Sequence, residues 1–568
     1  MTRSVRNLAA AMARVPTVLR TVRPLRARQA IAQLHHALFG VGKPRACPGD
    51  GARQAIAHPA TPYLPPAAHV RALGPGRYAL LATPFDSPRG AAWTASEHGP
   101  LFAYHLHQHE YLRCEAVTPA ERAAVIADWI QVHRAGVGWD PHPTGLRLIA
   151  WGKLMTTPGR LELGGAQEAA LLRSFADQAE TLSRNLEVRL QANHLLSNLL
   201  CVVFAGLLLD LPASAAWRGR ADRLAEALAD QIRPDGGHEE RSPMYHALLL
   251  ENVLDLLNLC RAAPDRAPAG LADALAEAAE RMLTALAALA HDDGRIALFA
   301  DSAFDVAAEP AALADYARRL GLQVDPDRPG TVCLPQSGYV RLAGGDWLLI
   351  ASVAPPSPPH QPGHAHCDAL AFELSVAGHR LVTDTGVFEY VVGPRREIAR
   401  ATASHATLQI DGEEQAEIWS AHRVGGRPEV ALTGFSEAGE AEAVCRGWSR
   451  RATLHRRRFR VSAAGVEIED FVEGPAREIV SRLPIAPEFA VELTSGAEPR
   501  ALCRSRAHPP LSVEIALPAA FAWRLETGAY YPGFGRALER SVLVGVASQC
   551  TGARTHLRRI APDEPLAR

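Results

Sequence analysis

Residues 364–374 read His364-Ala365-His366-Cys367-Asp368-Ala369-Leu370-Ala371-Phe372-Glu373-Leu374, which predicts a β-strand that carries two histidines. Apolar residues alternate with small or polar ones after Asp368, as in a half-buried strand. Residues two positions apart on a strand point to the same face, so His364 and His366 are predicted to serve one site. A turn at 377–379 would return the chain toward Asp384 and bring that carboxylate beside His366.

The same stretch supplies candidate metal ligands. Two histidines, Asp384 and a third histidine at His405 are ligand types of a Zn²⁺ site, with one histidine left for chemistry. Two alternatives are weighed. The chain has 23 histidines, and most histidines are surface or satisfied core side chains. The spacing His364-x-His366-x-Asp368 also matches half of the metallo-β-lactamase signature, but Ala369 replaces the expected second-metal histidine and disfavours a binuclear hydrolase.

Composition indicates a folded chain of more than one domain. The 568 residues are 48% hydrophobic, and the formal net charge is −1. This balance gives no electrostatic case for nucleic acid or an acidic membrane, although the first 30 residues are basic; that arm could equally be a solvated helix face. Nine cysteines without CxxC pairs do not indicate a disulfide framework. Neither a secretory signal peptide nor a transmembrane helix is predicted.

The period of the hydrophobic pattern divides the chain. Residues 116–325 are predicted to be helical, beginning with a capping box at Thr118-Pro119-Ala120-Glu121. The predicted helices cover 166–190, 192–210, 216–232, 242–260 and 270–290, and they form antiparallel hairpins in a solenoid or a closed toroid. Residues 331–568 have strand texture, which predicts a second, all-β domain. Residues 1–115 are predicted to be an arm packed on the helical domain.

The helical half contains a second group of polar residues in apolar surroundings. Asn193 and His194 open a strongly apolar helix. In the stretch 235–246, Ser242 is predicted as the N-cap of another helix, with Tyr245 and His246 in its first turn. A purely structural interpretation is a capped helix with Tyr and His side chains at its rim. A site in a cleft between the two domains is the alternative, and the separate His/Asp cluster favours it.

Three motifs together resemble the heparinase II/III family of polysaccharide lyases, which includes alginate oligosaccharide lyases. They are Asn193-His194-Leu195-Leu196-Ser197-Asn198, Gly237-His238-Glu239-Glu240-Arg241-Ser242-Pro243-Met244-Tyr245-His246 and the stretch 363–374. Residues 139–147 and 400–405 are similar to two further family segments. The resemblance implies an incomplete (α/α) toroid followed by an antiparallel β-sandwich. Three residues depart from the family pattern: Glu239, Cys367 and Ala406. None of them removes a catalytic group, so these departures bear on the choice of substrate rather than on catalytic competence.

The resemblance implies β-elimination at a uronic acid. Asn193, with His194 or His364, would donate hydrogen bonds to the substrate carboxylate as charge moves onto it. Tyr245 is the implied acid and a candidate base for syn elimination, with His194 or His364 as the alternative base. A phenol is a poor base at neutral pH unless neighbouring histidines or Arg241 lower its pKa. The predicted substrate-binding residues are Arg147, His238, Arg241 and His246.

The resemblance also assigns the metal and the partners. One structural Zn²⁺ per chain would be held by His366, Asp384 and His405, and would position His364. The expected partner is an acidic polysaccharide or oligosaccharide, with no nucleic acid, and a homodimer is an open alternative. A non-catalytic glycan-binding or envelope-assembly protein is the second functional hypothesis. The family implies the cell envelope or periplasm; the cytoplasm is the alternative because no signal peptide is visible.

Overall fold

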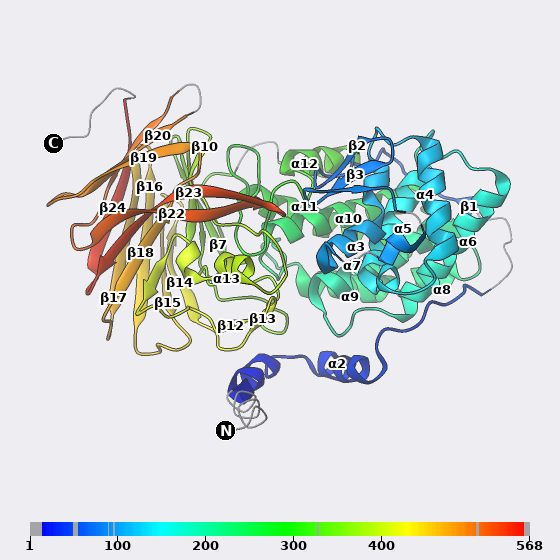
Figure 1. Ribbon diagram of the computed structural model, residues 1–568, viewed down its shortest axis with the longest axis horizontal. Coiled ribbons are helices and arrows are strands. Elements are labelled where there is room, and N and C mark those ends of the chain that lie inside the picture. Colours follow the sequence, from blue (N-terminus) through cyan, green and yellow to red (C-terminus); the bar gives the residue numbers. More distant parts are fainter. Residues whose placement is uncertain are drawn as a thin grey trace.

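The computed structural model describes residues 14–48, 55–88, 90–94, 97–325, 329–506 and 510–561. A helical region and a region of antiparallel sheets lie side by side along the long axis (Figure 1). This order confirms the predicted change from helix to strand. None of the described helices is long and apolar enough to cross a membrane.

The helical region is built around one long buried helix. Every residue of α7 (Ala192–Leu208) except His194 is buried, as its apolar sequence predicts. Its neighbours are α3 (Gly99–Gln108), α4 (Pro119–Val132), α5 (Pro141–Thr156), α6 (Gly165–Arg184), α8 (Ser214–Arg218), α9 (Ala221–Gln231), α10 (Pro243–Ala262), α11 (Leu271–Ala288) and α12 (Pro310–Arg319). One hydrophobic core runs through these helices.

Two predicted helix starts are confirmed. The Thr118 side chain accepts a hydrogen bond from the Glu121 backbone N–H at the start of α4. Ser242 does the same for the Tyr245 backbone N–H at the start of α10, where Pro243 is the first helical residue. Such caps satisfy backbone donors that have no partner inside the helix. The Ser242 cap fixes the first turn of α10, and therefore the position of Tyr245.

The sheet region contains three larger sheets, and all strand pairs are antiparallel. Their strand orders are β10-β9-β8-β7-β6, β11-β18-β23-β22 and β14-β15-β16-β17-β24-β21-β20-β19. The strands of the first are β6 (Val332–Leu334), β7 (Tyr339–Gly344), β8 (Trp347–Ser352), β9 (Phe372–Val376) and β10 (His379–Val382). Those of the second are β11 (Leu408–Ile410), β18 (Ile479–Pro484), β22 (Ala522–Gly533) and β23 (Arg536–Ala547). A shared hydrophobic core joins all three sheets.

The third sheet is the largest. Its strands are β14 (Glu429–Ser436), β15 (Glu440–Arg446), β16 (Leu454–Ser462), β17 (Gly465–Glu473), β19 (Phe489–Thr494), β20 (Arg500–Ser505), β21 (Ser512–Ala516) and β24 (Thr551–Ile560). Two shorter elements interrupt the strands: α13 (Pro394–Arg400) lies between β10 and β11 in the chain, and the hairpin of β12 (Ile418–Trp419) and β13 (Arg423–Val424) lies between β11 and β14. They cover the loop that bears His364, because Arg400 donates to the Ala365 carbonyl.

The strand prediction for residues 364–371 is wrong. The strand β9 begins only at Phe372, and the preceding residues form an irregular loop. Their backbone groups bond to scattered partners: the His364 carbonyl accepts from Asp301, and the Cys367 N–H donates to Arg400. The β9–β10 hairpin itself is confirmed, with His379 opposite Val376. The histidine pair is therefore positioned by contacts with other segments and not by the two-residue repeat of a strand.

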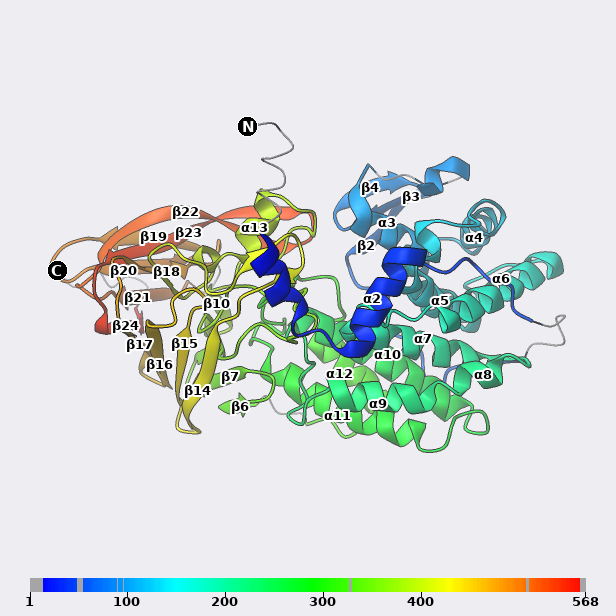
Figure 2. The ribbon, with the colours of Figure 1, turned by 90° about the horizontal axis from the view of Figure 1, so that it is seen from below.

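The N-terminal part of the chain contacts both regions. Residues 14–22 are helical, and α2 (Ala27–Phe39) follows them (Figure 2). Farther along come the small sheet of β2 (Val70–Gly74), β3 (Arg77–Leu80) and β4 (Thr83–Asp86), and a short pair of β1 (Ala55–Ile56) with β5 (Leu209–Asp210). Arg20 pairs with Glu417 of the sheet region, whereas Arg26 pairs with Asp230 of the helical region.

Candidate active site

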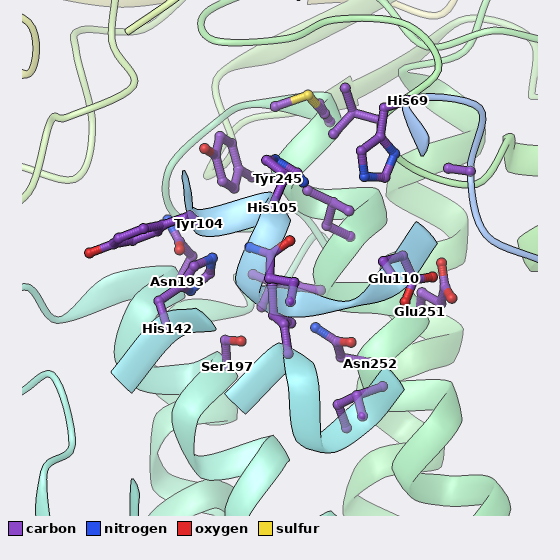
Figure 3. Close-up of a pocket in the computed structure, with 18 of the residues that line it drawn as sticks. His69, Tyr104, His105, Glu110, His142, Asn193, Ser197, Tyr245, Glu251 and Asn252 are labelled. Atoms are coloured by element: carbon purple, nitrogen blue, oxygen red, sulfur yellow. The ribbon is translucent and has the colours of Figure 1, made fainter. Parts of the chain in front are cut away.

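A cavity of about 150 Å³ lies where the helical region meets loops of the sheet region (Figure 3). Helices α3, α5, α7 and α10 supply most of its wall, and Tyr390 and Phe534 come from the sheet region. The polar side chains on its wall are His69, Tyr104, His105, Gln108, Glu110, His142, Lys153, Asn193, Ser197, Tyr245, Glu251, Asn252 and Tyr390. A cleft between two structural units is a common position for a binding site.

Asn193 connects the cavity to two other side chains. Its Nδ2 donates to Glu240 Oε2 over 2.6 Å and lies 3.3 Å from His364 Nε2. The Asn193 backbone N–H donates to the other Glu240 oxygen over 3.0 Å. Burial alone would raise the pKa of Glu240, but His364, His238 and the Asn193 bonds hold it below its ordinary value. The amide is thus oriented by a buried, negatively charged carboxylate.

A glycine turn delivers Glu240 to this position. Gly236 has φ +85°, and a Cβ there would lie 2.0 Å from the Arg281 carbonyl oxygen. At Gly237 a Cβ would lie 2.0 Å from Ser337 Oγ. Both positions therefore exclude any larger residue without rearrangement. Glu240 is a site residue that the sequence pattern did not reveal, although the adjoining Gly-Gly turn marked the segment.

Tyr245 faces the cavity from the first turn of α10. Its hydroxyl lies 3.0 Å from the Tyr390 hydroxyl, and its ring stacks on His364 with centroids 3.9 Å apart. Burial raises the pKa of Tyr245, and the charges of Asp301 and Glu240 raise it further. The proposed lowering by Arg241 or histidines is therefore corrected: the phenol stays protonated at neutral pH and is suited to donate a proton.

The buried carboxylate of Asp301 holds the His364 ring in one orientation. Its Nδ1 lies 2.9 Å from Asp301 Oδ2. A carboxylate can only accept a hydrogen bond, so Nδ1 carries the hydrogen and Nε2 keeps its lone pair when the ring is neutral. Nε2 points toward Asn193 and lies 3.6 Å from Glu240 Oε2. This arrangement of an imidazole oriented by a buried carboxylate is that of a general base.

His194 lies apart from the other three predicted catalytic residues. Its Nδ1 is 3.0 Å from Glu187 Oε2, and its ring is 4.9 Å from that of His142. Burial lowers the pKa of His194, but the Glu187 carboxylate outweighs this and raises it above the ordinary value. Asn193 and His194 are adjacent on α7 but point to different partners, because successive side chains on a helix diverge.

The four predicted substrate-binding residues are not on the wall of this cavity, and neither are His194 and His364. Arg147 is fully buried, donates to Gln178 and the His107 carbonyl, and packs over Trp129. Arg241 donates to the carbonyls of Pro355 and Gln336 instead.

His238 and His246 likewise have interior partners. His246 Nδ1 accepts from the His238 backbone N–H over 3.2 Å, and Nε2 lies 2.8 Å from the Met282 carbonyl. His238 Nε2 lies 3.2 Å from Gln231 Oε1. These contacts stabilise the turn before α10. In this structure both histidines therefore support the segment that carries Glu240 and Tyr245.

The predicted metal ligands come together. One potential ligand atom from each of His366, Asp384 and His405 lies within 4.8 Å of the others, and all three residues are buried. His366 Nδ1 and His405 Nε2 have no hydrogen-bond partner among the described residues. Two unpaired imidazole nitrogens beside a carboxylate fit a Zn²⁺ ion, since buried polar atoms otherwise require partners. A second such group in the described chain is His142, Glu187 and His194.

Asp301 joins the two groups of histidines and was not found from the sequence. Oδ2 faces His364 and Oδ1 lies 2.9 Å from His366 Nε2. Arg396 of α13 donates to both oxygens. Burial alone would raise the pKa of Asp301, but Arg396 and the two histidines hold it well below its ordinary range. The only sequence signal was a polar pair, Asp301-Ser302, after an apolar run.

Comparisons with known proteins agree with this architecture. The model described as "Heparinase II/III N-terminus" matches residues 165–318, and "Heparinase II/III-like, C-terminal" matches residues 326–554. The chain therefore belongs to the heparinase II/III-like family.

Individual relatives are more distant. The FtsZ-localized protein C of Caulobacter vibrioides is 27% identical over 463 residues, covering 73% of this chain and 76% of that protein. A crystal structure of heparinase III matches with TM-score 0.66 and 17% identity over 84% of this chain and 81% of that chain. A mutant of the heparan sulfate lyase HepC from Pedobacter heparinus matches with TM-score 0.58 and 16% identity over 85% of this chain and 80% of that chain. At these identities the structural likenesses show the fold alone.

Metal analysis tests the ligand group. Purified protein is expected to contain about one zinc per chain, and His366→Ala is expected to lose it and to unfold at a lower temperature. Inductively coupled plasma mass spectrometry and thermal unfolding give the two measurements. His379→Ala, which changes a histidine of the same hairpin outside the group, should keep the metal. Well-folded wild-type protein without zinc would contradict the assignment. Zinc retained by His366→Ala would show that the metal binds at another site.

Asp301→Asn tests the shared carboxylate. The change leaves Arg396 buried beside a neutral group, which is expected to destabilise the protein by about 3–5 kcal/mol. The measurement is the shift of the chemical-denaturation midpoint. Asp346→Asn is the matched control, because Asp346 pairs with Arg559 at the surface and should change stability by less than about 1 kcal/mol. Equal shifts for the two variants would show that Asp301 has no special structural role.

Proposed function

We propose that this protein is a polysaccharide or oligosaccharide lyase that cleaves a uronic-acid-containing glycan by β-elimination. The observation that carries the proposal is that Tyr245 and Asn193, which line the cavity, both contact His364 behind its wall: the Tyr245 ring stacks on the imidazole, and the Asn193 amide lies 3.3 Å from Nε2. These groups are a proton donor, a proton acceptor and a hydrogen-bond donor for an anion. We also propose that the helical region is an incomplete (α/α) toroid and the sheet region a β-sandwich.

In this mechanism His364 Nε2 takes the C5 proton of the uronic acid. The C5–H electron pair forms the C4=C5 double bond, the C4–O4 bond breaks, and Tyr245 donates its proton to O4. Asp301 holds the hydrogen on Nδ1 and so keeps Nε2 free to accept. A protonated phenol is the form needed for the second step, in agreement with the raised pKa of Tyr245.

The Asn193 amide would stabilise the charge that moves onto the uronate carboxylate. One of its hydrogens is bound to Glu240, and the other, now directed toward His364, is available to a substrate oxygen. Such a donor accelerates the reaction when it interacts more strongly with the transition state than with the ground state. We propose a structural role for zinc: it would hold the loop from 364 to 371 through His366, and no proton transfer involves it.

The charge of the cavity favours a glycan with few or no sulfate groups. Lys153 is the single Lys or Arg side chain on its described wall, and it pairs with Glu251 and Asp255. Glu110 and Glu251 also lie on the wall, where Glu110 pairs with Arg113 and Glu251 with Lys153, so no cation of this group is left free for a sulfate. Sulfate recognition uses free cations, Arg above all. An unsulfated uronic acid is therefore the substrate class that we propose.

A non-catalytic glycan-binding or envelope-assembly protein is the second candidate. The likeness to the FtsZ-localized protein C favours it, because that name describes a location and no reaction. Under this alternative the cavity binds a glycan end without cleaving it, at the cell envelope. A panel of unsulfated and sulfated uronic-acid polymers, followed by ultraviolet absorbance of the unsaturated product, separates the two: binding without any product would favour the alternative.

Tyr245→Phe is expected to lower turnover by at least 10²–10⁴-fold, the range typical of a general acid, while substrate still binds. Steady-state kinetics on the best substrate of the panel measures turnover, and calorimetry measures binding. Tyr104→Phe is the matched control, because Tyr104 lines the same cavity but its hydroxyl donates to Asp140. Wild-type turnover in Tyr245→Phe would remove the tyrosine from the mechanism.

Asn193→Ala is expected to lower kcat more than it raises KM, because its hydrogen bond strengthens as charge develops. An interaction made equally in both states would instead raise KM with kcat unchanged. Both constants are determined on the same substrate. Ser197→Ala, one turn along α7 on the same cavity wall, is the control and should leave kcat nearly unchanged. An effect of Asn193→Ala on KM alone would make Asn193 a binding residue.

A further inference from the structure

The two N-terminal helices expose their apolar side chains to solvent. In α2, Ile31 is 70% exposed, Leu34 63%, Leu38 67% and Phe39 72%. The helix at residues 14–22 exposes Val15, Val18, Leu19 and Val22. Figure 2 shows both helices in front of the body on one side, and Figure 1 shows them outside the main mass of the protein. We call these two helices, residues 14–39, the outer strap.

Uncharged polar side chains of the outer strap contact the body of the protein. Gln29 donates to the His360 carbonyl over 3.1 Å, and Gln33 donates to the Arg189 carbonyl over 2.9 Å. Thr17 donates to Glu417 over 2.7 Å. A surface helix of a globular protein normally buries its apolar stripe. In the outer strap the apolar stripe faces solvent instead, so it is available to a binding partner outside this chain.

The charge of the outer strap indicates which kind of partner binds its apolar stripe. The first acidic residue of the chain is Asp50, whereas the outer strap contains Arg14, Arg20, Arg23, Arg26 and Arg28. Arg20 and Arg26 attach the strap to the body. Arg14, Arg23 and Arg28 form no ion pair or side-chain hydrogen bond within the described ranges, and Arg23 and Arg28 are exposed beside the apolar stripe.

We propose that the outer strap docks this protein on an anionic lipid surface. An in-plane helix binds a bilayer by burying an apolar face at the level of the headgroups while Lys and Arg attract anionic lipids. Valine, leucine, isoleucine and phenylalanine on one side and unpaired arginines at the edge meet both needs. Because the strap is attached to Glu417 in one region and Asp230 in the other, docking would orient the whole body. This proposal does not depend on lyase activity.

Vesicle co-sedimentation of the full chain tests the proposal. The probes are vesicles of phosphatidylcholine with phosphatidylglycerol and vesicles of phosphatidylcholine alone. Wild-type protein is expected to sediment with the anionic vesicles, to do so less as salt rises, and to remain mostly in solution with the neutral ones. Equal binding to both, or binding to neither, would overturn the proposal.

Two double variants separate the apolar and charged contributions. Leu34→Asp with Leu38→Asp is expected to abolish sedimentation, and Arg23→Glu with Arg28→Glu to weaken it about tenfold or more. Leu538→Asp, an exposed leucine on β23, is the control for the first, and Arg71→Glu on β2 for the second. All six substituted positions are at the surface, so folding is expected to be retained and is checked by circular dichroism.

A second copy of the chain is the competing occupant of the apolar stripe. Sedimentation velocity without lipid distinguishes it: a monomer that binds anionic vesicles supports the proposal. A dimer that Leu34→Asp with Leu38→Asp dissociates, together with no vesicle binding by wild type, would assign the stripe to self-association and overturn the lipid proposal. Loss of vesicle binding in Leu538→Asp to the same extent as in the strap variant would also overturn it.

Discussion

The two oxygens of the buried Asp301 carboxylate serve two histidines with different tasks. One oxygen orients His364 beside the cavity and the other orients His366 in the metal group. The Asp301 carbonyl also accepts the hydroxyl of Ser242, the cap of α10, so the first turn that carries Tyr245 is tied to the same residue. The positions of Tyr245, His364 and His366 thus depend on one residue, and Arg396 offsets the charge of its side chain.

This arrangement explains why the Tyr245 phenol on the cavity wall stays protonated. Asp301 and Glu240 place negative charge behind the wall, and burial removes water from Tyr245, so ionising the phenol is disfavoured twice. A cation in the cavity would reverse the effect, but Lys153 is compensated by Glu251 and Asp255. The scarcity of free cations therefore has two consequences: it keeps Tyr245 a donor, and it removes the usual means of binding sulfate.

Short-range sequence patterns correctly predicted the elements that are stabilised by contacts between residues close together in the chain. The caps at Thr118 and Ser242, the apolar helix α7 and the β9–β10 hairpin follow from short-range patterns. The clustering of His366, Asp384 and His405 was predicted because these residue types are chemically distinctive. The loop at 364–371 was mistaken for a strand because its alternation reflects contacts on two sides rather than strand pairing. Asp301 and Glu240 could not be predicted, since their partners lie 63 and 47 residues away in the chain.

The outer strap and the cavity share a segment of chain, which links the two proposals physically. Gln29 of the strap donates to the carbonyl of His360, four residues before His364. His360 Nε2 lies 3.7 Å from Glu239 Oε1, next to the Glu240 that orients Asn193. A lipid surface bound to the strap and a ligand in the cavity would therefore both act on the loop that contains His360 and His364. If one of them changes the preferred position of that loop, thermodynamic linkage requires each to alter the affinity for the other by the same factor.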